Sequence, residues 1–150
     1  MRIVGDGGHA LAVKAIPLNE FQENGTIVAI GDNATRKRVV EEECAGHSFT
    51  TLIHPFSWVA DDVKIGEGTV IMAGAVIQPG VVIGKHVIVN TGATVDHGCQ
   101  VGDYVHLAPG VHQCGGVTVG EGTLVGVASC AVPGAELAAW SMVKAGSVVK

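Results

Sequence analysis

A six-residue repeat runs through the second part of this 150-residue chain and constrains its fold more than any other feature. Every sixth residue from Ile53 to Val149 is Ile, Val or Leu in 15 of 17 cases, and the exceptions are Gln113 and Ala131. Neither an α-helix, with its period of 3.6 residues, nor an isolated strand, with a period of two, produces a strict period of six. The repeat therefore predicts one repetitive architecture over residues 53–150.

Glycine recurs between the aliphatic positions and indicates a sharp corner in each repeat. A set of glycines follows the aliphatic residue directly: Gly66, Gly84, Gly102, Gly120 and Gly126. Glycine is favoured where the backbone needs a positive φ or must pack closely at a turn. The aliphatic residues are expected to point inward and stack from coil to coil, and an inward Gln113 then needs a hydrogen-bond partner.

Six-residue repeats of this kind are typical of a parallel β-helix. Three six-residue sides close one coil of about 18 residues, so residues 53–150 are expected to make about five coils. The chain is therefore predicted to be mainly β.

Residues 1–52 lack the repeat and look like a small, shortened α/β domain. Residues 2–4 and 26–30 read as short buried strands, and residues 34–44 read as an amphipathic helix. The stretch Gly5–Ala10 fits G-x-G-x-x-A, a tight turn that brings backbone N–H groups close to a phosphate. Pro17 is expected to cut the first helix short. The predicted domains are therefore 1–52, which is Rossmann-like, and 53–150, the β-helix.

Composition excludes several classes of function. The net charge is −5, so no basic field attracts nucleic acid or anionic lipid. No apolar run approaches the roughly 20 residues that a membrane-spanning helix needs, and residues 1–6 do not resemble the start of a signal peptide. The four cysteines form no CxxC pair, which favours reduced thiols and a cytoplasmic location.

Histidines are the candidate reactive groups of the repeat. His97 lies two residues after inward Val95 and should face outward, whereas His106 and His112 lie five residues after an inward position and are expected near corners. Histidine clusters can bind zinc, but the spacings of 9 and 6 residues do not favour a metal site. A general base is the better interpretation, because neutral imidazole accepts a proton from an attacking amine or hydroxyl.

Two features near His97 bear on such chemistry. Asp96 is adjacent in sequence but is expected to point away from the ring. The backbone N–H groups around Gly115 and Gly116 are candidates to stabilise a thioester oxyanion.

Motifs along the whole chain resemble, in order, the bacterial sialic acid O-acetyltransferase and nucleotide-amino-sugar N-acetyltransferase family. The matching stretches are Gly7-Gly8-His9-Ala10, Ala29-Ile30-Gly31-Asp32-Asn33, His54-Pro55, Ile65-Gly66-Glu67-Gly68-Thr69-Val70-Ile71, Asn90-Thr91-Gly92, Val95-Asp96-His97, Tyr104-Val105-His106-Leu107-Ala108-Pro109-Gly110 and Gly115-Gly116-Val117. The resemblance implies a left-handed β-helix, acetyl-CoA as co-substrate without a metal, and a role in surface polysaccharide synthesis. It also implies a homotrimer with each active site between two β-helices.

The resemblance assigns roles residue by residue. His97 matches the catalytic base, and His106 matches the histidine that contacts the thioester region of acetyl-CoA. The positions that line the CoA channel are Gly115, Val127 and Ala145, and those that contact the nucleotide-sugar or its sugar are Gly7, Gly8, His9 and Asn90.

The chain departs from the family pattern in three places. Gly98 stands where the family usually has Asp or Glu after the base. The N-terminal domain lacks the usual second strand, and the family normally continues past Lys150 with a short tail beside CoA.

Three hypotheses remain open. The first is acetyl transfer from acetyl-CoA to the amino group of a nucleotide-linked amino sugar. The second is O-acetylation of sialic acid or a related sugar hydroxyl. The third is a non-catalytic trimeric scaffold, for which Gly98 and the short N-terminal domain argue.

Overall fold

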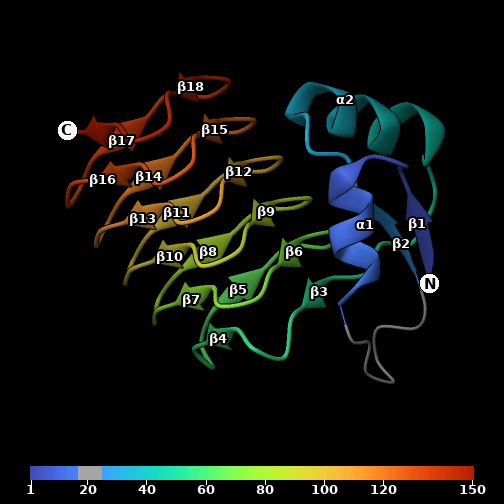
Figure 1. The fold of residues 1–150 in the computed structure, drawn as a ribbon, viewed down its shortest axis with the longest axis horizontal. Coiled ribbons are helices and arrows are strands. Elements are labelled where there is room, and N and C mark those ends of the chain that lie inside the picture. Colours follow the sequence, from blue (N-terminus) through green and yellow to red (C-terminus); the bar gives the residue numbers. More distant parts are fainter. Residues whose placement is uncertain (17–24) are drawn as a thin grey trace.

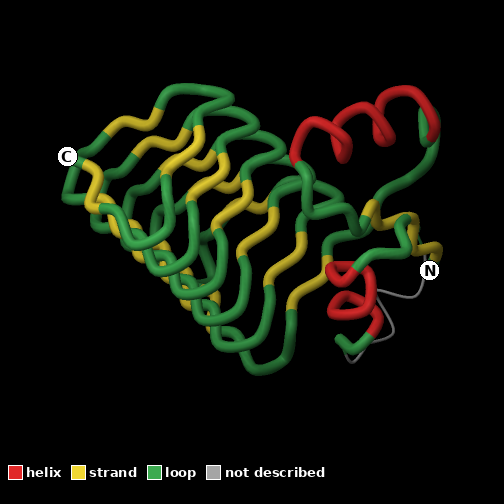
Figure 2. The backbone as a smooth tube through the Cα atoms, turned by 45° about the horizontal axis from the view of Figure 1, so that its top comes forward, coloured by secondary structure: helices red, strands yellow, loops and turns green. Residues whose placement is uncertain are grey.

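The computed structural model describes residues 1–16 and 25–150, and most of it is a three-sided parallel β-helix (Figures 1 and 2). Each two-residue strand pairs in parallel with the strand 18 residues later, as Val95 does with Gln113. This register confirms the predicted coil of three six-residue sides, and the prism has roughly five turns.

The strands fall into three sheets, which form the faces of the prism. Face 1 consists of β3 (Leu52–Ile53), β6 (Val70–Ile71), β9 (Ile88–Val89), β12 (His106–Leu107), β15 (Leu124–Val125) and β18 (Met142–Val143). Face 2 consists of β4 (Trp58–Val59), β7 (Val76–Ile77), β10 (Thr94–Val95), β13 (His112–Gln113), β16 (Cys130–Ala131) and β19 (Val148–Val149). Face 3 consists of β5 (Lys64–Ile65), β8 (Val82–Ile83), β11 (Gln100–Val101), β14 (Thr118–Val119) and β17 (Glu136–Leu137).

The core of the prism is the predicted aliphatic column. The second residue of each strand points inward, and those from Ile71 to Leu137 are buried. Gln113 is the polar member, only 1% exposed, and neither of its amide atoms has a hydrogen-bond partner. Its neighbour in register is Ala131, a small residue beside the longer glutamine. The predicted partner for Gln113 is therefore absent among the described residues.

The corners share one backbone feature at a period of six. Fourteen successive corner residues from Gly68 to Gly146 have positive φ. Ten of them are glycine, and the other four are His86, Tyr104, Ala128 and Trp140. A non-glycine residue in this left-handed region is strained. Three of the four lie on one edge of the prism, the corner between faces 3 and 1 (corner 3–1). The glycines that directly follow an inward residue, such as Gly66 and Gly102, do not have positive φ; a Cβ there would meet the backbone of the next coil within 2.7 Å.

The N-terminal residues form a small α/β layer beside the β-helix (Figure 1). Its elements are β1 (Arg2–Val4), α1 (Gly8–Lys14), β2 (Thr26–Val28), α2 (Asn33–Arg38) and a π-helical turn over Val39–Glu43. Strands β1 and β2 pair in parallel. The second strand is two residues shorter than predicted, and α2 begins one residue earlier because the Asp32 carboxylate caps it by accepting the Thr35 N–H at 2.8 Å. Helix α1 ends at Lys14, and Pro17 lies outside the described residues.

The two parts of the chain pack against each other. Ala10 and Val13 of α1 share a buried cluster with Leu52 and Val70, so this helix covers the outer side of face 1. Helix α2 lies on corner 3–1, where the Asn33 amide donates to the Gly122 carbonyl at 3.0 Å. Because Leu52 belongs to this shared cluster, the division at residue 52 stays a prediction.

Candidate active site

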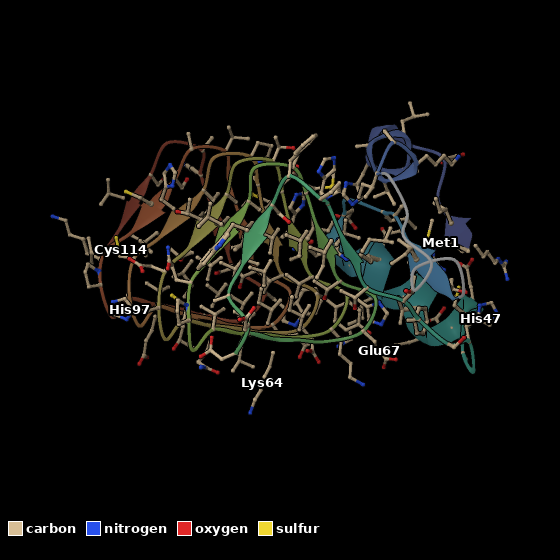
Figure 3. All side chains as sticks on the ribbon, turned by 90° about the horizontal axis from the view of Figure 1, so that it is seen from below. Met1, His47, Lys64, Glu67, His97 and Cys114 are labelled. Carbon is tan, nitrogen blue, oxygen red and sulfur yellow. The ribbon has the colours of Figure 1, made fainter. Side chains whose placement is uncertain are left out.

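His97 lies at the corner between faces 2 and 3 (corner 2–3), between β10 and β11. It is exposed, as predicted, and lies near Cys114 at the end of the molecule away from Met1 and His47 (Figure 3). A Cβ on Gly115 would lie 2.7 Å from both Cε1 and Nε2 of His97. The imidazole therefore rests on the glycine of the next coil, and only a residue without a side chain leaves room for this ring position.

The backbone around His97 is well defined. The Asp96 carboxylate accepts the N–H of His97 at 2.7 Å, so it holds the main chain and not the ring. The N–H of Gly116 donates to the His97 carbonyl at 2.9 Å and is therefore not free to act as an oxyanion donor. Gly98 adopts φ +69°, the conformation that glycine tolerates best. Of the two predicted oxyanion donors, Gly115 remains.

His106 lies on face 1, in β12, and its two ring nitrogens are both engaged. Nδ1 lies 3.2 Å from the Gly31 carbonyl, which can only accept, so Nδ1 carries the proton. Nε2 then accepts from the Asn90 amide nitrogen at 3.1 Å. The Asn90 amide is itself oriented, because its oxygen accepts the Thr91 N–H at 2.8 Å. The hydrogen bonds thus define one tautomer of His106.

The electrostatic surroundings of this histidine favour the uncharged form. Burial, and then the positive charge of Arg36, lower the pKa of His106 to about 4. The same two causes lower the pKa of His9 to about 4. The rings of His9 and His106 lie 6.2 Å apart, and His9 Nε2 is buried without a hydrogen-bond partner. Face 1 therefore presents two neutral imidazoles beside Asn90.

The glycine turn that precedes α1 borders a cleft of about 470 Å³. Gly7, Gly8 and His9 line this cleft together with Gly31 and Thr35. A Cβ on either Gly7 or Gly8 would meet nothing within 4 Å, so the main chain of this turn is open to a ligand. Because Gly31 borders this cleft and also accepts from His106, the cleft is connected to face 1.

The remaining two predicted CoA residues lie elsewhere. Val127 and Ala145 are both exposed at the corner between faces 1 and 2 (corner 1–2), and they are 18 residues apart, in successive coils. The exposed fraction of Val127 is 50%.

The site residues thus form three groups on one chain. Gly7, Gly8, His9, Asn90 and His106 gather at face 1, His97 and Gly115 at corner 2–3, and Val127 and Ala145 at corner 1–2. In a three-sided prism, corner 2–3 lies opposite face 1. His97 and His106 therefore face different directions in a single chain.

Two expectations about the histidines need correction. His106 and His112 were expected near corners, but each is the first residue of a two-residue strand. A residue one position before an inward residue faces outward from the same strand, because side chains alternate along it. His112 is exposed and hydrogen-bonds to the Thr94 hydroxyl at 2.8 Å.

Within residues 1–16 and 25–150, no three His, Cys, Asp or Glu side chains are grouped so that they could hold a metal ion. No helix in the same ranges is long and apolar enough to span a membrane. All four cysteines are free thiols.

Comparison with known proteins identifies the family. A family model described as bacterial transferase hexapeptide (six repeats) matches residues 62–97. The acetyltransferase domain of PglB from Neisseria gonorrhoeae is similar over 99% of this chain and 90% of that domain, with 30% identity and a TM-score of 0.87. The chain belongs to the hexapeptide-repeat acetyltransferases.

Two further relatives of these acetyltransferases are informative. A variant of perosamine N-acetyltransferase from Caulobacter crescentus, solved with CoA and GDP-perosamine, is 32% identical over 99% of this chain and 87% of that one, with a TM-score of 0.89. UDP-N-acetylbacillosamine N-acetyltransferase from Bacillus subtilis is 48% identical over 48 residues. That match spans 31% of this chain and only 22% of the curated relative.

Sequence reasoning missed Arg36 and the Gly31 carbonyl as parts of the site. The carbonyl carries no side-chain signal. Arg36 looked like one of several charged residues on an amphipathic helix, and its burial depends on contacts with residues 50 or more positions away.

Proposed function

We propose that this chain transfers the acetyl group of acetyl-CoA to the amino group of a nucleotide-linked amino sugar, with His97 as general base. The observation that carries the base assignment is the exposed imidazole seated on Gly115, where no side chain competes for the space. The substrate class is supported by the relative solved with CoA and GDP-perosamine, because this chain spans 87% of its length.

The proposed reaction balances within one ternary complex. The sugar amine attacks the thioester carbonyl, a C–N bond forms and the C–S bond breaks. His97 accepts the proton that the amine loses and returns it to the departing thiolate, so CoA leaves as the thiol. The Gly115 N–H, which has no partner among the described residues, is a candidate donor to the developing oxyanion. No cysteine nucleophile is needed.

The acceptor is proposed to bind at the glycine turn and face 1. Gly7, Gly8 and His9 would contact the nucleotide-sugar from the cleft, and Asn90 would lie near the sugar. His106 would contact the thioester region as a neutral group, because its proton stays on Nδ1. A neutral histidine is suited to a hydrogen-bonding role and not to general-acid chemistry at neutral pH.

The active site is proposed to lie between two copies of the chain in a homotrimer. His97 at corner 2–3 and His106 on face 1 cannot meet in one prism, but a corner of one copy can pack against a face of the next. Such head-to-tail contacts close into a ring when the rotation is threefold. Val127 and Ala145 at corner 1–2 would then line the CoA channel. Sedimentation of a monomer under assay conditions would contradict this arrangement.

We further propose that the protein acts in the cytoplasm and contributes to bacterial surface polysaccharide synthesis. The free thiols are compatible with a reducing compartment. Both proposals depend on the acetyl-transfer activity.

A thiol-release assay tests the function directly. Purified protein is given acetyl-CoA and a panel of acceptors with either a free amino group or only hydroxyl groups, and CoA release is followed with a thiol reagent. Release that depends on an amino-sugar nucleotide supports the proposal. Release with hydroxyl acceptors alone would favour O-acetylation, and no calorimetric binding of acetyl-CoA at millimolar concentration would favour a scaffold.

A further inference from the structure

Arg36 of α2 is buried with a charge that has no carboxylate partner among the described residues. It is 1% exposed, and every group that accepts from its guanidinium is an uncharged oxygen. Burial lowers its pKa only to about 10, so it stays protonated near neutral pH. A buried unpaired charge is costly and persists only where a dense set of hydrogen bonds compensates.

Two of the six hydrogen bonds that Arg36 donates reach left-handed corner residues of the β-helix. Nε donates to the His86 carbonyl at 2.9 Å, and Nη2 donates to the Tyr104 carbonyl at 2.7 Å. The coil-to-coil ladder does not use these carbonyls, because the Tyr104 N–H donates instead to Lys85. A buried carbonyl outside the ladder needs another donor. One guanidinium supplies it to two successive coils.

The other edge of the guanidinium holds the loop that enters α2. Nη1 donates to the Ile30 carbonyl at 2.8 Å and more weakly to the Gly31 carbonyl at 3.3 Å. The Gly31 carbonyl is the group that accepts from Nδ1 of His106. The planar fork of arginine can bridge two sets of acceptors in a fixed geometry, which a lysine ammonium cannot reproduce.

We infer that Arg36 is a positioning residue of the acetyl-transfer site: it ties the Ile30–Gly31 loop to corner 3–1 and thereby places the carbonyl that orients His106. The inference rests on the proposed function for its catalytic meaning, but the geometry of His106 can be tested without it. It assigns no contact between Arg36 and substrate.

The positive charge of Arg36 also supports its role as a positioning residue, because it favours the neutral form of His106. Four groups face the His106 ring: Arg36 from α2, His9 from α1, the Gly31 carbonyl and the uncharged Asn90 amide from the β-helix. Burial and Arg36 both lower the pKa of His106, the hydrogen bond to the Gly31 carbonyl opposes them, and His9 adds a weaker lowering effect. Asp32 makes no salt bridge with Arg36, but its charge raises the pKa of Arg36 and partly offsets the effect of burial. The ring is therefore held in its neutral Nδ1–H form by both position and charge.

The first test is the ring ¹⁵N spectrum of His106 in the wild-type protein, assigned by its loss in His106→Asn. We expect the Nδ1–H tautomer, unchanged between pH 5.5 and 8. An Nε2–H tautomer, or a titration midpoint above pH 6, would overturn the inference.

The second test compares two variants of α2. Arg36→Lys keeps the charge but loses the fork, so we expect mixed His106 tautomers and a kcat about tenfold lower, with a smaller change in the KM for acetyl-CoA. The control is Lys37→Met, which removes the 2.6 Å salt bridge between α2 and Glu121 of the β-helix and should leave the His106 tautomer and kcat unchanged. Unchanged tautomer in folded Arg36→Lys would overturn the inference, even if the urea midpoint falls.

A third measurement covers the case in which Arg36→Lys does not fold. In the wild-type protein the Nε–H of Arg36 should exchange with water at least a hundredfold more slowly than that of half-exposed Arg38. Equal exchange would overturn the inference. If the wild-type chain acetylates no amino sugar, the proposed function fails, whereas the ¹⁵N results still decide whether Arg36 positions His106.

Discussion

Corners 3–1 and 2–3 of the prism share the left-handed backbone conformation but differ in the residues that adopt it. Corner 3–1 carries Gly68, His86, Tyr104, Gly122 and Trp140 at its positive-φ positions, whereas corner 2–3 carries only glycine there, at Gly80, Gly98, Gly116 and Gly134. Helix α2 covers the first corner through side chains that bond its carbonyls. The segment Asn33–Arg38 makes no comparable contacts with the second.

The difference shows where this fold tolerates strain. His86 stacks on Tyr104 at a centroid distance of 5.3 Å and meets Phe49 edge-on at 4.6 Å. Lys37 lies 5.5 Å from the Tyr104 ring and 5.3 Å from the Trp140 ring. These contacts offset the cost of left-handed non-glycine residues. Among the described residues, corner 2–3 has no such contacts, its positive-φ positions are all glycine, and His97 is accessible.

The largest effect is expected from the accessible corner. His97→Ala should lower kcat by about 10² to 10⁴, because it removes the proposed general base. The measurement is CoA release under saturating acetyl-CoA. His112→Ala is the matched control, since His112 is also exposed and bonds only to Thr94 in the described structure. An unchanged rate in His97→Ala would remove His97 from the mechanism.

A smaller loss of activity is expected at Gly115. Its φ is outside the left-handed region, so the strain of Gly115→Ala comes from the His97 ring and not from the backbone. Displacing the ring should lower kcat by about tenfold to a hundredfold with little change in the urea midpoint. Cys114→Ala is the control at the adjacent position. Equal kcat in both variants would show that the ring position does not matter.

His86 at corner 3–1 should make the free energy of unfolding depend on pH. Burial is the main cause that lowers the pKa of His86 to about 4, against about 6.5 in an unfolded chain. Between these values the unfolded chain binds more protons, so stability falls as pH decreases from 6.5 to 4.

This histidine contributes at most about 1.4 kcal/mol per pH unit in that window. His86→Phe should flatten the dependence of the unfolding free energy on pH, as measured by urea titration. Thr118→Val, on exposed face 3, is the control. The same slope in His86→Phe and the wild type would contradict the assignment.

The smallest expected effects are on the free energy of unfolding, when a strained left-handed residue is replaced by glycine. Ala128 has φ 54° and is exposed at corner 1–2, so Ala128→Gly should stabilise the protein by up to about 1 kcal/mol. Trp140→Gly relieves similar strain but loses the ring over Gly122 and its contact with Lys37, so it should destabilise by about 1 kcal/mol. Urea unfolding gives the sign of each change in unfolding free energy. If both variants shift stability in the same direction, contacts with α2 do not offset the strain at Trp140.

The sequence predicts the prism because its inward column is locally encoded. Inward residues such as Ile77 and Val95 belong to an aliphatic series with a spacing of six residues, so their burial can be predicted without knowledge of distant contacts. Tyr104 and Trp140 at left-handed corners could not be predicted, because local chemistry disfavours them and their compensation comes from α2. The residues at corner 3–1 were therefore not predictable, because the contacts that stabilise them come from residues far away in the sequence.

The site was predictable to a similar extent. His97 was placed on the outside because it follows Val95 by two residues. His106 was misplaced at a corner because strands of only two residues leave no room for error in register. Its fixed tautomer depends on a backbone carbonyl 75 residues earlier, which no side-chain pattern records.

The central claim is that His97 and His106 serve one site from different copies of the chain. The most direct measurement combines two variants that each lack one of the two histidines, His97→Ala and His106→Asn, by co-expression, and compares CoA release with that of each variant alone. If the site lies between copies, one site in each mixed trimer combines an intact His97 with an intact His106, so about a quarter of all sites recover activity after random assembly. No recovery in trimers shown to contain both variants would contradict the account.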